Sequence, residues 1–144
     1  MTIVNKCNLP EDLYYVVGKH VWARLEGGLV TVGMTDVAQN MAKTIVAVTP
    51  KAVGRIVQKG RNIATVESGK WVGPVSAPVT GEIVAVNGAL VASPGLVNSD
   101  PYGEGWVARL RPSSWEDDAA DLVTGPEGVE AYRRFLDAEG IVCG

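Results

Sequence analysis

The sequence predicts a mainly β (α+β) domain, in which short strands form the core and a few helices flank it. Three observations support this fold class. Short runs rich in β-branched residues alternate with glycine and proline along the middle of the chain. Apolar residues make up 47% of the 144 residues, enough to support one buried core. No linker-like segment divides the chain, so a single domain is expected over residues 1–144.

The strands are expected where β-branched residues stand between turn-forming residues. A first hairpin is predicted at residues 21–25 and 29–32, because Gly27 and Gly28 between them readily adopt the positive φ angles of a tight turn. Further strands are expected at residues 45–48, 53–57, 63–67, 75–79, 83–86 and 106–110.

The helices are predicted from their capping residues. Thr35 and Asp36 supply side-chain oxygens for the free amides of a short helix over residues 37–42. A C-terminal helix is expected to begin at Pro126 and to stop at Gly140. One face of this helix carries Val129, Tyr132 and Leu136, and a further turn or short helix is predicted at residues 113–117.

The sequence argues against a nucleic-acid partner and against a membrane-spanning segment. The formal charge is −3 and the basic residues are scattered, whereas a nucleic-acid surface requires clustered Lys and Arg. No stretch approaches the roughly 20 apolar residues that span a bilayer. Residues 1–20 show no pattern of a secretory signal. Cys7 and Cys143 lie at opposite ends of the chain, which suggests incidental thiols rather than a disulfide framework, so a protein of the reducing cytoplasm is expected.

The residues of common catalytic and metal sites are missing. The single histidine, His20, cannot build a multi-histidine metal site, and there is no Cys-x-x-Cys pair. We therefore expect His20 to be a packed or hydrogen-bonded structural residue. The acidic run 116–118 is typical of a solvated helix start rather than an acid–base pair. No metal site and no enzyme activity are predicted.

A short internal repeat surrounds one lysine. Residues 54–57 and 81–84 share the pattern Gly-charged-Ile-Val, and Lys70 lies between them. If the domain consists of two similar halves, the hairpin around Lys70 lies at its far end. A strand is expected to end at Glu67, and the turn after it holds Lys70. Spacing alone favours the interpretation of Lys70 as an ordinary surface lysine.

The hairpin resembles the lipoylation site of the glycine-cleavage H protein family. That site reads Val-Glu-Ser, one residue, the modified lysine, and later Ala/Ser-Pro-Val-Ser/Thr-Gly-Glu, as residues 66–70 and 77–82 do here. The resemblance implies that lipoic acid is covalently attached to Lys70. It further implies that Glu67 and Gly81 help the lipoate-attaching enzyme to recognise its target. A biotin carrier would have Met on both sides of the lysine, where Gly69 and Trp71 stand here.

The resemblance extends over most of the chain. His20-Val21-Trp22 matches the family's His-x-Trp strand, residues 33–39 match Gly-Ile-Thr-Asp-Tyr-Ala-Gln, and residues 96–106 match Leu-Val-Asn-x-Asp-Pro-Tyr-Gly-Glu-Gly-Trp almost residue for residue. The implied fold is the lipoyl/biotinyl-type hybrid, a flattened β-barrel or sandwich with short peripheral helices and a C-terminal helix. The implied function is that of a carrier whose swinging lipoyllysine arm moves a thiol-bound intermediate between enzymes.

The chain departs from the family around the lysine and on the expected surface. Trp71-Val72-Gly73-Pro74 replaces small residues and a polar-acidic pair, Lys43-Thr44 replaces Gly-Asp, and Lys51 stands at a position that tends to be acidic. The segment 69–74 resembles the lipoate-binding proteins of the bacterial sulfur-oxidation pathway built around a heterodisulfide-reductase-like complex. We therefore expect a cytoplasmic sulfur-oxidation carrier, with a glycine cleavage H protein carrying an aminomethyl group, or a non-lipoylated interaction protein, as alternatives.

The expected partners follow from the resemblance. They are a lipoate ligase or lipoyltransferase, dihydrolipoyl dehydrogenase, and either the heterodisulfide-reductase-like complex or the glycine cleavage enzymes, all acting on a monomer. Trp71 is expected either to shield the lipoyl arm or merely to pack on the hairpin and stiffen its tip.

Overall fold

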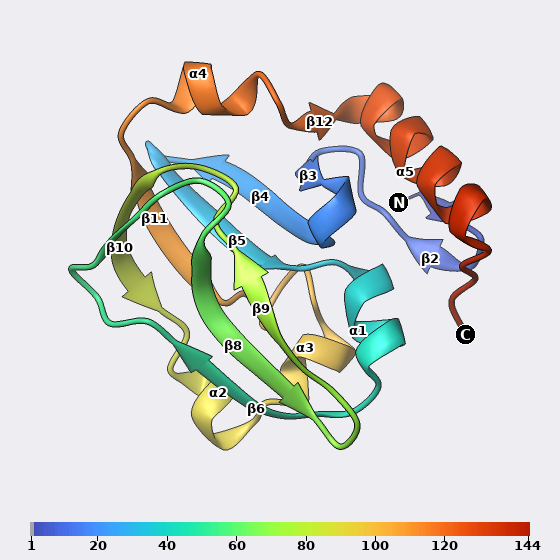
Figure 1. Ribbon diagram of the computed structural model, residues 1–144, viewed down its shortest axis with the longest axis horizontal. Coiled ribbons are helices and arrows are strands. Elements are labelled where there is room, and N and C mark those ends of the chain that lie inside the picture. The colour runs from blue at the N-terminus through green and yellow to red at the C-terminus, as the bar shows by residue number, and fades with distance from the viewer. Residues whose placement is uncertain (1) are drawn as a thin grey trace.

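The computed structural model describes residues 2–144 and shows three antiparallel sheets (Figure 1). The largest has seven strands, in the spatial order β12 (Val123–Thr124), β3 (Tyr14–Val16), β4 (Val21–Glu26), β5 (Leu29–Met34), β11 (Ala108–Pro112), β10 (Gly81–Val86) and β7 (Ile56–Val57). A three-stranded sheet consists of β6 (Ile45–Pro50), β8 (Asn62–Ser68) and β9 (Val72–Ser76), and a two-stranded sheet of β1 (Ile3–Val4) and β2 (Cys7–Asn8).

Short helices surround these sheets. They are the 3-10 helix η1 (Val17–Lys19) and the α-helices α1 (Asp36–Ala42), α2 (Ala89–Ala92), α3 (Leu96–Ser99), α4 (Trp115–Ala119) and α5 (Gly125–Glu139). The larger two sheets form a flattened open sandwich, as the sequence predicts. Within residues 2–144, no helix has the length and apolar character to cross a membrane.

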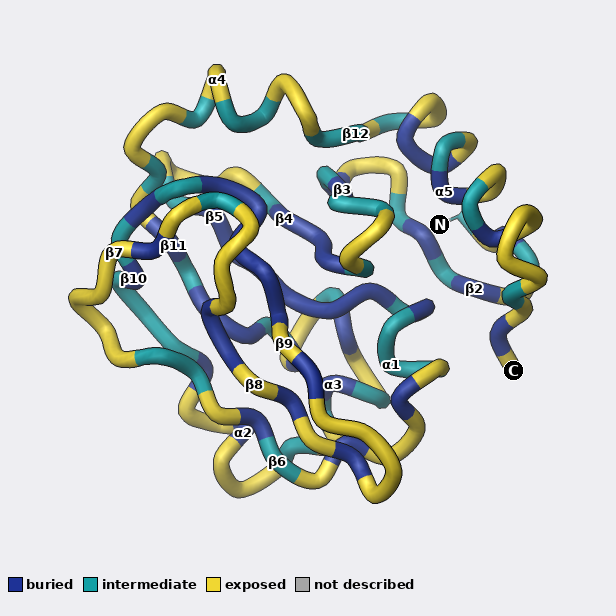
Figure 2. Tube along the Cα trace, in the orientation of Figure 1, coloured by how far each residue is buried: buried dark blue, intermediate teal, exposed yellow. Residues whose placement is uncertain are grey.

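Apolar side chains from the two larger sheets fill one core. Val30 and Leu110 from the seven-stranded sheet and Ile63 and Val66 from the three-stranded sheet are fully buried in the same cluster. From Ala64 to Ser68, buried and exposed residues alternate along β8, as the dark and yellow segments of Figure 2 show. Because a shift of one residue would turn this whole set outward, the burial pattern fixes the register of the hairpin.

Most expected elements are present, with shifted boundaries. Gly27 and Gly28 have φ angles of 58° and 78°, which confirms the tight hairpin turn. The strand expected at 53–57 is shortened to β7, because Val53 and Gly54 lie in a turn closed by the Arg55 N–H and the Ala52 carbonyl. The strand expected at 75–79 is β9, which begins and ends earlier, and the one expected at 106–110 is β11, which begins later.

The two repeat segments pair with each other. β7 and β10 are antiparallel, with Val57 opposite Gly81. The pairing continues through the Gly54 N–H to the Ile83 carbonyl and the Ile83 N–H to the Arg55 carbonyl, both 2.8 Å. Much of the chain between the segments forms the β8–β9 hairpin, so its tip lies at the far end from this pairing, as expected.

The predicted helix ends are confirmed. The Thr35 hydroxyl accepts a hydrogen bond from the Ala38 N–H at 3.3 Å and caps α1. Pro126 stands in the first turn of α5, and Gly140 ends the helix with a φ of 64°. The apolar face of α5 is buried against the N-terminal segment through Val129, Tyr132 and Leu136.

The expectation of two free thiols is wrong, because Cys7 and Cys143 form a disulfide. Helix α5 returns the C-terminal tail to β1 and β2, where the Cys143 N–H donates to the Asn5 carbonyl at 2.9 Å. Both cysteines are buried in a second apolar cluster with Trp22 and the apolar face of α5. The pairing joins positions 136 residues apart and has no local sequence signal, so only the packing of the two chain ends reveals it.

Candidate functional site

Lys70 lies at the exposed tip of the β8–β9 hairpin. The Ser68 N–H donates to the Trp71 carbonyl at 2.7 Å and closes the turn. The Ser68 hydroxyl also accepts from the Lys70 N–H at 3.4 Å, so the side chain of a strand residue supports the tip from inside. The turn therefore holds the backbone while the lysine side chain extends from it.

Glu67 lies on the solvent face of the same sheet. It stands opposite Val72 on β9 and Ala47 on β6, and its neighbour Val66 points into the core. Alternation along β8 thus places the carboxylate outside, beside the tip that carries Lys70. The structure places these two predicted site residues together.

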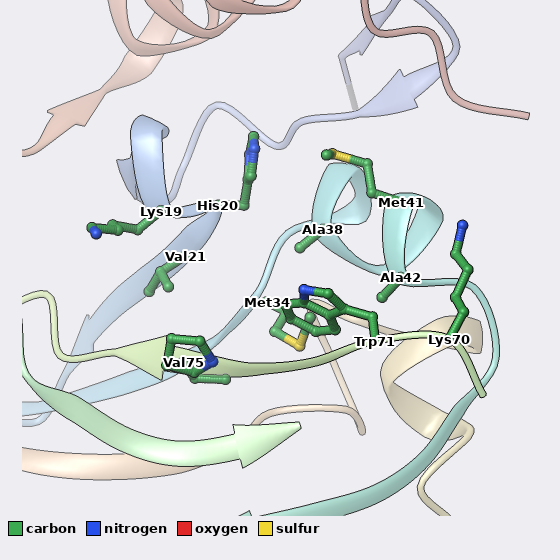
Figure 3. A pocket seen from close by; sticks show the side chains of 11 residues that line it. Lys19, His20, Val21, Met34, Ala38, Met41, Ala42, Lys70, Trp71 and Val75 are labelled. Carbon is green, nitrogen blue, oxygen red and sulfur yellow. The ribbon is translucent and has the colours of Figure 1, made fainter. Parts of the chain in front are cut away.

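A largely apolar pocket of about 390 Å³ adjoins Lys70. Met34 and Val75 contribute from β5 and β9, and α1 contributes three side chains (Figure 3). Lys70 stands at one end of the pocket and Lys19 at the other. The remaining lining residues are His20, Val21, Ala38, Met41, Ala42, Trp71 and Pro74.

Trp71 forms a wall of this pocket and packs against its own hairpin. A Cβ on Gly73 would lie 2.0 Å from the Trp71 ring, so the ring rests where a larger residue at 73 would stand. The side chain is still 39% exposed. Trp71 therefore packs on its own hairpin and also borders the space beside Lys70.

His20 connects the pocket to α5. Its Nδ1 contacts the Tyr132 hydroxyl, and that hydroxyl lies 3.0 Å from the Thr35 hydroxyl at the start of α1. Burial lowers the pKa of His20, so its ring is neutral at pH 7. His20 is thus the hydrogen-bonded structural residue that the sequence predicts, although its partner Tyr132 could not be identified from sequence.

Gly81 lies away from the tip, at the start of β10. It is not in a turn that needs a positive φ. A Cβ there would instead lie 2.4 Å from the Arg111 carbonyl oxygen on the neighbouring strand. Glycine is therefore required at this position because the backbone of β11 approaches it closely.

We expect Gly81→Ala to lower the free energy of unfolding by about 2 kcal/mol, because the backbone of β11 must move to admit the methyl group. Urea unfolding followed by tryptophan fluorescence measures this loss. Gly88→Ala is the matched control, since a Cβ at Gly88 meets nothing within 4 Å. Equal stability of the two variants would contradict the packing role.

Residues of the long motif at 96–106 take part in the packing of the fold. The Trp22 indole N–H donates to the Pro101 carbonyl at 2.9 Å, and the Tyr102 hydroxyl accepts from the Asp36 N–H at 2.8 Å. A Cβ on Gly105 would lie 2.6 Å from the Leu96 carbonyl. The departures Lys43 and Lys51 do not line the pocket with Lys70.

Comparisons with known proteins agree on one family. Residues 13–135 match the family model described as "Glycine cleavage H-protein". The chain is 47% identical over 148 residues to "Glycine cleavage system H protein 5" of Aquifex aeolicus, covering 100% of both chains. It is 49% identical over 132 residues to "Glycine cleavage system H protein" of Thermus thermophilus, covering 92% of this chain and 98% of that one.

A solved structure agrees with the fold. A crystal structure of a glycine cleavage system H protein from Mycobacterium marinum superposes with a TM-score of 0.75 at 32% identity, covering 92% of this chain and 100% of that one. Glycine cleavage H proteins are carriers rather than catalysts, and they hold lipoate covalently on a lysine. The chain belongs to the glycine cleavage H-protein family.

Proposed function

We propose that this protein is a lipoyl carrier and that Lys70 is its attachment residue. The observation that carries the proposal is the position of Lys70, which is exposed on a closed turn and adjoins an apolar pocket. A lipoate-attaching enzyme requires an accessible amine, and the arm that results requires a surface on which to rest. Incubation with a lipoate ligase, ATP and lipoate should raise the intact mass by one lipoyl group, and an unchanged mass would favour the non-lipoylated interaction protein.

The residues around the lysine fit such an arm. Lipoate supplies a cyclic disulfide that opens to a dithiol and exchanges with thiols. The rigid sheet under the hairpin presents Lys70, and Met34 and Trp71 offer apolar surface beside it. Attachment through Lys70 also confines the arm and raises its effective concentration at a bound enzyme.

Glu67 and Gly81 are proposed to guide the lipoate-attaching enzyme. Glu67 does so directly, because its carboxylate is exposed beside the tip. Gly81 lies within a strand and acts through the backbone geometry that it permits.

Glu67→Ala should slow lipoate attachment at least several-fold while lowering stability by about 0.5 kcal/mol or less, since the side chain is exposed. Initial rates of attachment, followed by intact mass, measure the effect. Thr65→Ala, on the same exposed face of β8, is the control. Equal rates in all three proteins would place recognition elsewhere.

Trp71→Ala should leave attachment nearly intact but speed the alkylation of the reduced arm several-fold, because one wall of the pocket is removed. The rate of iodoacetamide labelling, measured by mass, tests this expectation. Val72→Ala is the control, since Val72 is exposed on the same hairpin and does not line the pocket. Identical rates would show that Trp71 only stiffens the tip.

Two partner sets are candidates for the loaded carrier. The glycine cleavage enzymes are the first, because the relatives named above are glycine cleavage system H proteins. The heterodisulfide-reductase-like complex is the second. It is favoured by Trp71 in the pocket wall, and by the absence of Asp and Glu among the pocket-lining residues that the structure describes. Dihydrolipoyl dehydrogenase serves either set. We further propose that the carrier is cytoplasmic and monomeric.

A reconstituted glycine-cleavage system from the same organism separates the two sets. The lipoylated protein is supplied beside that system's dedicated H protein. Comparable turnover supports the first set and excludes a specialised sulfur carrier. Negligible turnover together with transfer to heterodisulfide-reductase-like enzymes supports the second.

A further inference from the structure

The pocket beside Lys70 has two ends of different chemistry. Lys70 and Met41 stand at one end, and Lys19, His20 and Val21 stand at the other (Figure 3). A chain attached to the Lys70 amine and lying in the pocket would therefore bring its distal end toward Lys19. Whatever group is bound to the distal sulfur would meet the charge at that end.

The charge on the described pocket lining is positive. It includes two lysines and one histidine, and neither Asp nor Glu. Acylation turns the Lys70 ammonium into a neutral amide, and burial lowers the pKa of His20, so that its ring is neutral at pH 7. Of the lining residues that the structure describes, Lys19 then remains as the formal charge, and within residues 2–144 it forms no ion pair.

Neither Asp36 nor Glu67, the acidic residues of α1 and β8, lines the pocket. Asp36, on α1, accepts hydrogen bonds from the Asn8 N–H and the Gln39 amide, each at 2.7 Å, and does not line the pocket. Glu67 extends from the outer face of β8 and is likewise outside the lining. Lys19 is exposed, so its side chain is free to turn toward a group bound at this end of the pocket.

We propose, building on the lipoyl-carrier function, that the Lys19 end of this pocket receives a small anionic group bound to the lipoyl sulfur and disfavours an ammonium group. Lys19 can turn toward an oxyanion such as a sulfonate or carboxylate and pair with it. An ammonium group at the same place meets a like charge without a carboxylate to compensate. The anionic cargo therefore docks, and the cationic one stays in solvent.

Three conjugates of equal length test this proposal. The lipoylated protein is reduced by dihydrolipoyl dehydrogenase and NADH, which spares the buried Cys7–Cys143 disulfide. One thiolate then displaces bromide from 2-bromoethanesulfonate, 2-bromoethanol or 2-bromoethylamine, forming one carbon–sulfur bond and ending in a sulfonate, a hydroxyl or an ammonium. Intact mass verifies one lipoyl group and one label on each protein.

The docked fraction is read from amide chemical shifts of Ala38 and Met41, which line the pocket. We expect the ratio of docked to free arm to be about tenfold higher for the sulfonate than for the ammonium, with the hydroxyl between them. The difference should shrink at about 1 M salt, where screening acts over only a few ångströms.

Two charge reversals identify the residue responsible. Lys19→Glu should invert the order of the sulfonate and ammonium conjugates. Arg55→Glu, an equal change of charge at an exposed position outside the pocket, should leave the order unchanged.

The outcomes separate this inference from the function on which it rests. An ammonium conjugate that docks as well as the sulfonate, or an order unaffected by Lys19→Glu, overturns the charge preference alone. Pocket shifts absent from all three conjugates also overturn it, while the lipoyl mass would leave the carrier function intact. A protein that gains no lipoyl group overturns both.

Discussion

Replacing Lys70 with arginine should abolish the electron-carrying activity of the lipoylated preparation. Arginine keeps the positive charge at the tip but has no amine that can form the lipoyl amide. With dihydrolipoyl dehydrogenase and NADH, the wild type should be reduced at one disulfide per chain, and Lys70→Arg should give only the background rate. The oxidation of NADH at 340 nm (the wavelength at which NADH absorbs) measures the difference.

The structure supplies the control for this loss. Lys70 is exposed and its side chain forms no ion pair among residues 2–144, so Lys70→Arg should change the unfolding free energy by less than about 0.5 kcal/mol. Lys59→Arg is the matched control. It keeps a positive charge at position 59, where the wild-type lysine pairs with Asp121, and it should be lipoylated like the wild type. NADH-dependent reduction that persists in Lys70→Arg would show that the lipoyl group lies elsewhere.

The double variant Cys7→Ala/Cys143→Ala should lose about 4 kcal/mol of unfolding free energy. The disulfide joins positions 136 residues apart and restricts nearly the whole unfolded chain, and both sulfur atoms also fill the second core cluster. Chemical denaturation without reductant measures the loss. Each single variant should lose a similar amount, because either one removes the cross-link.

A thiol titration distinguishes a disulfide between Cys7 and Cys143 from two buried cysteines that are not bonded. Wild-type protein unfolded without reductant should show no reactive thiol, and after reduction it should show two. If the double variant were as stable as the wild type, or if the unfolded wild type titrated two thiols without reduction, the disulfide would not form in solution. The tip around Lys70 is built by other elements, so lipoylation of the double variant should persist while it remains folded.

Local signals in the sequence predict much of the fold. The glycine pair at 27–28, the cap at Thr35 and the stop at Gly140 act on backbone within a few residues of themselves, so each predicts its element correctly. The short strand β12 pairs with β3, which is distant in sequence, and no local pattern predicts it. The disulfide is the clearest such case, because only the return of α5 to β2 brings Cys7 and Cys143 together.

The candidate site likewise has parts that local sequence signals predict and parts that depend on contacts between distant segments. The hairpin and Lys70 can be located from the sequence, because alternation along β8 and the turn after it are local. The pocket cannot, since Lys19, Met34, Ala38 and Trp71 come from separate elements. Gly81 shows a further limit, because the close approach of the Arg111 backbone cannot be inferred from its position in the motif.

The location of the lipoyl group tests the account most directly. The chain has six lysines, at positions 6, 19, 43, 51, 59 and 70. After incubation with a lipoate ligase, ATP and lipoate, peptide mass spectrometry should find one lipoyl group per chain, on the peptide that contains Lys70. Lipoylation of another lysine, or a chain that remains unmodified while a known H protein is fully modified alongside it, would contradict the account.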